Sequence, residues 1–308
     1  MSRGTKVVLL YAPQTAVETV PTTGWKILPR KSDSLNNSVE MTDSETIADS
    51  RIKTAGMVTS ASSEGDIECE FIKGAYDDLI EAAAGNLWAT DVLTFGGDVV
   101  KMFAIEKAHK DISQYHLWKG MQVNSFKLDI PESGYISCTF GFMGSGYENK
   151  LVTYSSAAAA AITSPKATSL TVGDIKLDGS TLQGVACVTA FSFELTNNIE
   201  KQNCLGSGLY GSNLLAMLAD MTGSMTLAYS QKAQQILNNQ LTGAPVSIEA
   251  LIKFGEGDDD SYLLTIPKAQ ISGDIPSGGK DKLEASLTYS VYADVPADYP
   301  TLTRVITP

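Results

Sequence analysis

The adjacent carboxylates Asp77 and Asp78, in the run AYDDLIEAA, are the residues whose type and spacing first suggest chemistry. Two carboxylates can act as general acid and base when both converge on one substrate. The run predicts a short helix, on which neighbouring residues point about 100° apart, so these two side chains do not converge. We interpret them as a solvated helix face in the first turn, where the helix dipole favours negative charge.

Neither histidine nor cysteine forms a recognisable reactive motif. His109 and His116 are the two histidines, in EKAHKDISQYHLW, and the sequence has no G-x-S-x-G nucleophile elbow, so surface or pairing roles are expected. The four cysteines are widely spaced and form no C-x-x-C, which predicts neither a zinc site nor a redox pair. We interpret them as free, buried, small apolar residues: Cys69, Cys138, Cys187 and Cys204.

Two glycine-containing runs resemble ligand loops but lack their context. GSGLYG at 206–211 satisfies G-x-G-x-x-G, yet an alternating strand follows it and no βαβ unit does, so we predict a plain loop with Ser212 capping a helix through Ala219. GEGDDD at 255–260 lacks the calcium-loop spacing and the closing Glu, and we predict a solvated hairpin tip. The sequence therefore predicts a protein that is not an enzyme and has no cofactor, metal or catalytic site.

Composition restricts the remaining classes of function. The chain has 308 residues, 43% of them hydrophobic, and a formal net charge of −12. This balance suits a globular protein and argues against wrapping nucleic acid, which needs clustered Lys and Arg, although an acidic surface can repel DNA. The N-terminal apolar run at 7–11 is too short for a secretory signal, and we expect a soluble chain synthesised in a cytosol.

One strand–helix pattern occurs twice. GDIECEFIKGAYDDLIEAAAG at 65–85 and GSMTLAYSQKAQQILNNQLTG at 223–243 share length and apolar rhythm: alternation, then helical spacing, then a glycine suited to a left-handed cap. Two further segments, 115–142 and 262–289, each predict a hairpin of long antiparallel strands. The matching order predicts an internal duplication.

The predicted fold is mainly β, with two tandem antiparallel β-sandwich or partial-barrel domains that each carry a short helix. Residues 12–56 are polar and poor in periodicity, which indicates either disorder or an arm that orders against a neighbour. The alanine run at 157–161 is compatible with either a linker or a helical turn. The predicted division is an N-terminal arm with the first strands (1–56), a first domain (57–154), a linker (155–169), a second domain (170–295) and a C-terminal tail (296–308).

Three segments together resemble the tail tube proteins of long-tailed, non-contractile bacteriophages, over about residues 20 to 295. The first is a strand–helix junction, the second a hairpin arm and the third a strand followed by a Gly–Ser loop. The matching residues are Glu70, Phe71, Gly74, Tyr76, Asp77, Asp78 and Leu79; then Gly120, Val123, Asn124 and Leu128; then Phe193, Leu195, Asn197, Gly206 and Ser207.

The resemblance implies a structural protein of the virion tail whose rings stack into a hollow tube for DNA ejection. A duplicated subunit implies a homotrimeric, pseudo-hexameric ring, with a tape measure protein, a tail terminator and a distal tail protein as partners, no membrane, and DNA passing without specific binding. A related secretion-tube ring protein and a β-rich carbohydrate-binding or hydrolytic module are the alternatives.

The resemblance also assigns candidate surfaces. The acidic strand face consists of Glu64, Asp66, Glu68 and Glu70, whereas the second copy has Ser224, Thr226, Ala228 and Ser230 there. This face is predicted to line the lumen, and the outer wall of the tube is the alternative. The polar arm at 30–56 and the turn at 131–134 are predicted at ring–ring contacts. The candidate contact residues are Trp25, Ile27, Leu28, Pro131, Glu132 and Gly134.

Overall fold

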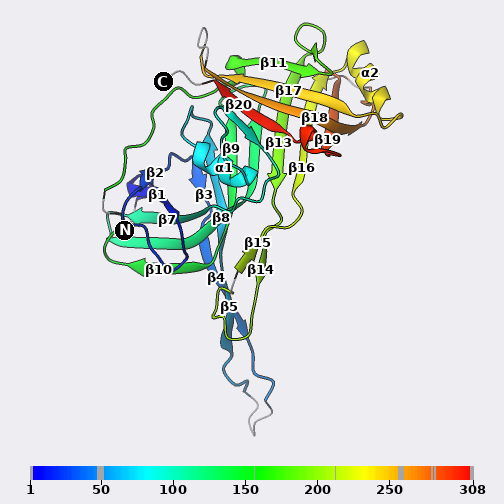
Figure 1. Cartoon of the computed structure of the whole chain (residues 1–308). Helices are drawn as coiled ribbons and strands as arrows, with labels where there is room; N and C mark the ends of the chain where they lie inside the picture. Colours follow the sequence, from blue (N-terminus) through cyan, green and yellow to red (C-terminus); the bar gives the residue numbers. More distant parts are fainter. Residues whose placement is uncertain are drawn as a thin grey trace.

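Antiparallel strands dominate both halves of the computed structural model (Figure 1). The structure describes residues 3–46, 52–155, 157–211, 213–255, 260–278, 280 and 282–305. The first half contains a 3₁₀ turn, ten strands and one helix: η1 (Gly4–Lys6), β1 (Val7–Gln14), β2 (Lys26–Ile27), β3 (Ser32–Asp33), β4 (Asn36–Thr42), β5 (Met57–Glu70), α1 (Asp77–Ala84), β6 (Val92–Thr94), β7 (Met102–His109), β8 (Gln114–Ile130), β9 (Ser137–Gly144) and β10 (Gly146–Lys150).

The second half has the same character. Its elements are η2 (Ser169–Thr171), β11 (Val172–Leu177), β12 (Ser180–Thr181), β13 (Val188–Thr196), β14 (Glu200–Gln202), β15 (Asn213–Leu215), β16 (Asp220–Ala228), α2 (Gln231–Asn239), β17 (Val246–Lys253), β18 (Ser261–Gly273), β19 (Glu284–Val291), η3 (Pro296–Asp298) and β20 (Thr301–Val305).

The two predicted strand–helix blocks are present and differ in how their helices end. Helix α1 ends at Gly85, whose φ of 65° is the left-handed cap that its sequence predicts. Helix α2 is capped at its N-terminus by Ser230, whose hydroxyl accepts a hydrogen bond from the Ala233 N–H, and it ends at Asn239. Its predicted cap, Gly243, has a φ of 63° but lies beyond a further turn, because Gln240 remains right-handed.

The strand pairings of the first half are repeated in the second. Six ladders of the first half have a counterpart in the second. The corresponding ladders are β1–β7 and β11–β17, β7–β8 and β17–β18, β8–β9 and β18–β19, β5–β9 and β16–β19, β4–β5 and β13–β16, and β8–β10 and β18–β20. Corresponding strands also follow one another in the same chain order. This agreement supports the duplication that the sequence predicts.

Long strands connect the two layers of each sandwich. The first part of β8 pairs with β7 and β10, and its second part pairs with β9. Strand β18 likewise pairs first with β17 and β20 and then with β19. One large apolar cluster fills the space between the layers and includes Phe140, Phe193, Met225 and Leu264. The predicted mainly β class with antiparallel sandwich domains is confirmed.

The halves are also joined to each other by strand pairing. Strand β13 of the second half pairs with the second part of β8, from Phe191 opposite Ile130 to Thr196 opposite Ser125. Strand β20 pairs with β6 of the first half as well as with β18, and it lies beyond the predicted boundary at residue 295. The domain division stays a prediction, with the repeated pairings extending through residue 305.

The polar N-terminal region is largely structured. Its β4 and the start of β5 form a long hairpin that projects from the body of the molecule (Figure 1). The segment at 155–169 contains no α-helix in the part that the structure describes; Ala159 instead exchanges backbone hydrogen bonds with Trp25 and Ile27, at 2.8 and 3.2 Å. The linker therefore lies along the first half as extended chain.

Candidate functional site

A continuous polar face covers one side of the sheet that crosses both halves. Because side chains alternate along a strand, residues in register share one face. Three rows across β5, β9, β8, β13 and β16 are made of polar residues and one glycine: Glu70, Ser137, Asp129, Ser192 and Ser224; Glu68, Thr139, Lys127, Glu194 and Thr222; and Asp66, Gly141, Ser125, Thr196 and Asp220. We call these rows, with Thr288 and Ser290 of β19, the polar sheet face.

The opposite side of the same sheet is the core. The intervening row Cys69, Cys138, Leu128 and Phe193 is buried, with each residue at most 3% exposed. The sheet is therefore amphipathic across the junction of the halves, which makes it one wall rather than two separate surfaces.

Lysines compensate part of the acidity of the polar sheet face. Lys31 Nζ lies 2.6 Å from Glu68, and this lysine together with Ser32 lowers the pKa of the Glu68 carboxyl. Lys166 pairs with Glu70. Glu64 and Asp66 are exposed, and the Ser62 hydroxyl donates a long hydrogen bond of 3.3 Å to the Glu64 carboxylate. The four predicted acidic residues do share one strand face, but two of them are paired.

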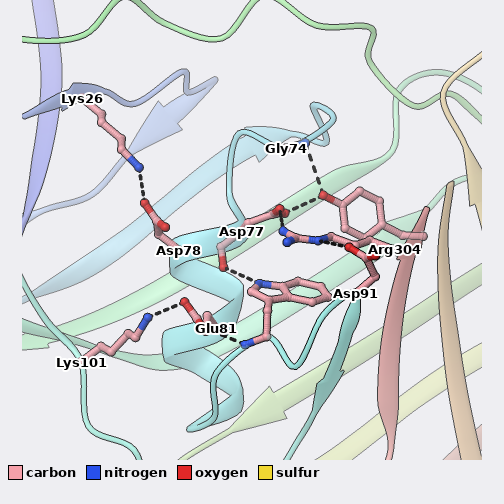
Figure 2. A network of polar contacts seen from close by, with 10 residues as sticks. Lys26, Gly74, Asp77, Asp78, Glu81, Asp91, Lys101 and Arg304 are labelled. Carbon is pink, nitrogen blue, oxygen red and sulfur yellow. Dashed lines mark hydrogen bonds and ion pairs between the residues drawn. The ribbon is translucent and has the colours of Figure 1, made fainter. Parts of the chain in front are cut away.

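Helix α1 carries three carboxylates that each bind a different partner (Figure 2). Asp77 accepts the Tyr262 hydroxyl at 2.5 Å and pairs with Arg304, whereas Asp78 lies 2.5 Å from Lys26 Nζ. Glu81 pairs with Lys101. The interpretation of Asp77 as part of a solvated face is wrong, because its side chain is 17% exposed and contacts β18 and β20, whereas the Asp78 side chain is 35% exposed.

The Asp77 contacts connect the two halves. Tyr262 belongs to β18 and Arg304 to β20, and the Tyr262 hydroxyl also accepts the Gly74 N–H at 3.3 Å. Burial and the neighbouring Asp77 charge raise the pKa of Tyr262, so its hydroxyl stays protonated and donates. The sequence predicts neither partner, because they are 185 and 227 residues from Asp77 and stand in no motif.

The predicted ring-contact segments lie at opposite ends of the sheet. Thr42 and Met57 form the last described ladder pair at the outer end of the β4–β5 hairpin. The turn with Pro131, Glu132 and Gly134 follows β8 at the other end, where Glu70 lies opposite Ser137. Glu132 is exposed and lies 3.1 Å from Lys282 Nζ.

The side chains of Trp25 and Leu28 are buried within their own chain. Trp25 is 1% exposed and Leu28 is 2% exposed, and the Trp25 indole donates to the Pro21 carbonyl at 2.9 Å. Ile27 is half-buried and lies opposite Leu10 in the β1–β2 ladder. We therefore remove Trp25 and Leu28 from the candidate ring contacts, since their side chains are not presented to another copy.

The remaining sequence motifs have ordinary structural roles. Residues 206–211 lie in the connection between β14 and β15, with Gly206, Gly208 and Gly211 at positive φ. The predicted helix from Ser212 to Ala219 is wrong, because β15 occupies Asn213–Leu215; Ser212 itself lies outside the described residues. Most of the predicted 255–260 tip also lies outside them, although β17 and β18 on either side do pair.

The cysteines and histidines are structural as well. Cys69 and Cys138 are buried opposite each other, but Cys187 and Cys204 are exposed, which corrects the prediction that all four are buried. His116 Nδ1 lies 2.6 Å from the Tyr147 hydroxyl, and its ring stacks on that tyrosine. Among the described residues, no group of three or more His, Cys, Asp or Glu side chains could hold a metal ion.

A family model described as phage tail tube protein matches residues 4–291. The chain belongs to the phage tail tube protein family. A search of curated proteins found no match. The resemblance drawn from the strand–helix junction, the hairpin arm and the Gly–Ser loop is thereby confirmed at the level of the family.

Membership of the phage tail tube family makes this a structural protein of the bacteriophage virion tail that assembles with itself. Within the part of the chain that the structure describes, no helix is long and apolar enough to cross a membrane.

Proposed function

We propose that this protein is the major tail tube subunit of a long-tailed, non-contractile phage, and that its rings stack into the tube through which DNA leaves. The observation that carries the proposal is the polar sheet face, which continues without interruption from the first half to the second. A tube wall needs one such face toward the channel and an apolar face toward the protein core. The protein is not an enzyme in this proposal.

The channel lining follows from the chemistry of this face. DNA is a polyanion, so a wall that carries serines, threonines and carboxylates repels or tolerates it, whereas clustered lysines would bind it. Glu64, Asp66, Glu68 and Glu70 contribute the acidic sector, and Ser224 and Thr226 contribute a neutral one. The lumen would alternate between these sectors around the ring.

The ring contains three chains in this proposal. Each chain supplies two sandwich units with matching strand ladders, so three chains give six units around a pseudo-sixfold axis. Head-to-tail contacts between unlike edges close into a ring when the rotation fits. The β4–β5 hairpin and the 131–134 turn, at opposite ends of the sheet, make the ring-to-ring contacts. The tape measure protein, tail terminator and distal tail protein are the proposed partners in the tail.

Negative-stain imaging of the purified chain tests the assembly. Rings with a central hole, or uniform tubes, are expected; monomers that remain dispersed at high concentration would contradict the proposal. Class averages that show three major repeats, each split into two, support the trimer, and six identical chains per ring would refute it.

A charge variant tests the lining. Thr222→Lys with Thr288→Lys adds two cations to the polar sheet face at exposed positions. Tubes of this variant should retain short DNA and protect it from nuclease, whereas unmodified tubes should not. Gln235→Lys with Asn238→Lys, at exposed positions on α2, is the matched control and should not protect DNA.

A further inference from the structure

In the part of the chain that the structure describes, each half has an open strand edge at the side of the sheet that carries the polar sheet face. Among the described residues, β3 and β4 pair only with β5, which leaves the outer edge of Ser32–Thr42 without a strand partner. At the other side of the sheet, the end of β18 from Gln270 to Gly273 pairs only with β19. Open edges present unpaired backbone groups and are templates for another strand.

The junction between the halves shows how two such edges meet, because β13 and β8 occupy the corresponding positions. Strand β13 flanks β16 as β3 and β4 flank β5. The correspondence extends to side chains: Ser34 Oγ accepts the Asp66 N–H at 2.8 Å, and Ser192 Oγ accepts the Ser224 N–H at 3.1 Å. On the other side, Gly273 opposite Leu287 in the β18–β19 ladder corresponds to Phe126 opposite Phe140 in the β8–β9 ladder.

We propose that neighbouring copies of this chain join by repeating the β8–β13 ladder between β18 of one copy and β3–β4 of the next. The inference rests on the proposed ring assembly and assigns its interface. Transferring the internal register gives an antiparallel ladder with these pairs: Leu35 with Ile275, Asn36 with Asp274, Asn37 with Gly273, and Ser38 with Ser272.

Backbone directions agree with this ladder. The Ser34 N–H donates to the Asp66 carbonyl at 2.9 Å, so alternation directs the Leu35 and Asn37 backbone groups toward the open edge. The Gly273 N–H also faces outward, since it donates to the exposed Gln240 side chain at 3.1 Å. A neighbouring strand would replace Gln240 as its acceptor.

Pro276 does not interrupt the ladder. By the same alternation the backbone groups of Gly273 and Ile275 face the neighbour, whereas those of Asp274 and Pro276 face the β19 side. The missing N–H of a proline matters only on the side where a bond is needed.

Burial points to the same interface. Leu128 is 3% exposed at the internal junction, where β13 lies beside it, whereas its counterpart Ile275 is 66% exposed in the single chain. An exposed isoleucine beside an open strand edge is an aggregation hazard, which pairing with Leu35 of the next copy removes. The new ladder lacks one internal feature: Asn197, which bonds the Val123 and Ala83 carbonyls, has Val39 as its counterpart.

Paired cysteines test the register. Asn36 and Asp274 form a non-hydrogen-bonded pair in the proposed ladder, and the Cα separation of such pairs, about 4.5 Å, permits a disulfide. In a Cys187→Ser, Cys204→Ser background, Asn36→Cys with Asp274→Cys should give disulfide-linked dimers and trimers under conditions that assemble rings. Asn37→Cys with Asp274→Cys is the matched control, because those side chains point to opposite faces and should not cross-link.

A second variant tests the contact without disulfides. Ile275→Asp should leave the melting temperature of the monomer unchanged and abolish rings, whereas Leu151→Asp, also on an exposed leucine, should leave rings intact. Rings that form without the Asn36–Asp274 cross-link, or with equal cross-linking of both pairs, overturn the ladder while the ring proposal stands. If the unmodified chain forms no rings under any condition, the proposed function itself fails.

Discussion

Asp77 at the start of α1 pairs with Arg304 in β20, 227 residues later in the chain. The pair lies between the two repeated units, where the Arg304 guanidinium also stacks over Trp88, with 4.4 Å between the guanidinium carbon and the ring centroid. Both side chains are largely buried, at 17% and 24% exposed. The last strand is thus attached to the helix of the first half by charge as well as by its ladder with β6.

Replacing Arg304 by Gln should therefore destabilise the fold. The change leaves the Asp77 carboxylate partly buried with only the Tyr262 hydroxyl and solvent, and we expect a loss of about 1–3 kcal/mol in the free energy of unfolding. Chemical denaturation measures it. Lys53→Gln removes the exposed Lys53–Asp43 pair and should cost less than about 0.5 kcal/mol. Equal costs for the two variants would show that Arg304 contributes nothing through burial.

Gly223→Ala should also be destabilising, for a steric reason. A Cβ atom there would lie 2.2 Å from the Ser192 carbonyl oxygen and 2.3 Å from the Tyr289 ring. The tyrosine cannot move freely, since its hydroxyl donates to that same carbonyl at 2.7 Å. We expect a loss of about 1–3 kcal/mol, typical of overpacking. Gly4→Ala, with open space at its Cβ, is the control; a similar cost there would contradict the steric argument.

Shortening the β4–β5 hairpin should separate ring formation from ring stacking. Removing residues 30–50 would delete β3, β4 and the buried Leu35. A sharper variant replaces residues 43–56 by Asn-Gly, which suits a two-residue turn between the paired Thr42 and Met57. Its melting temperature should match the parent, and images should show rings without tubes. Tubes of normal length would exclude the hairpin from the stacking contact.

Stability should fall on mild acidification because of His116. Burial, His109 and Lys107 lower the pKa of His116 below its ordinary value of 6.5. The folded state binds this proton less tightly than the unfolded state, so the contribution is complete above pH 6.5 and is lost as the pH falls through the lower, folded-state pKa. His116→Gln should flatten the dependence of melting temperature on pH between about 7 and 5. If the slope of melting temperature against pH is unchanged in this variant, other titrating groups cause the loss of stability.

The local spacing of apolar and polar residues was sufficient to predict the repeated strands and helices. Alternation of Ile67, Cys69 and Phe71 with carboxylates identified a half-buried strand, helical spacing identified α1 and α2, and Gly85 marked the end of α1. These signals depend on residues within one or two turns, where backbone geometry alone relates spacing to direction. The helix expected after Ser212 is absent: LLAML has helical composition, but its first two residues, Leu214 and Leu215, belong to β15, which pairs with β14.

The sequence by itself determined the two strand–helix units, the mainly β class, the acidic strand face and the family to which the chain belongs. Only the tertiary structure decided that Trp25 and Leu28 are buried, that Asp77 has Arg304 as its partner, and that β13 pairs with β8. Those relationships join residues far apart in the chain, and a strand's own sequence does not specify which edge it meets. The ladder at the internal junction therefore had to be observed before a ladder between copies could be inferred.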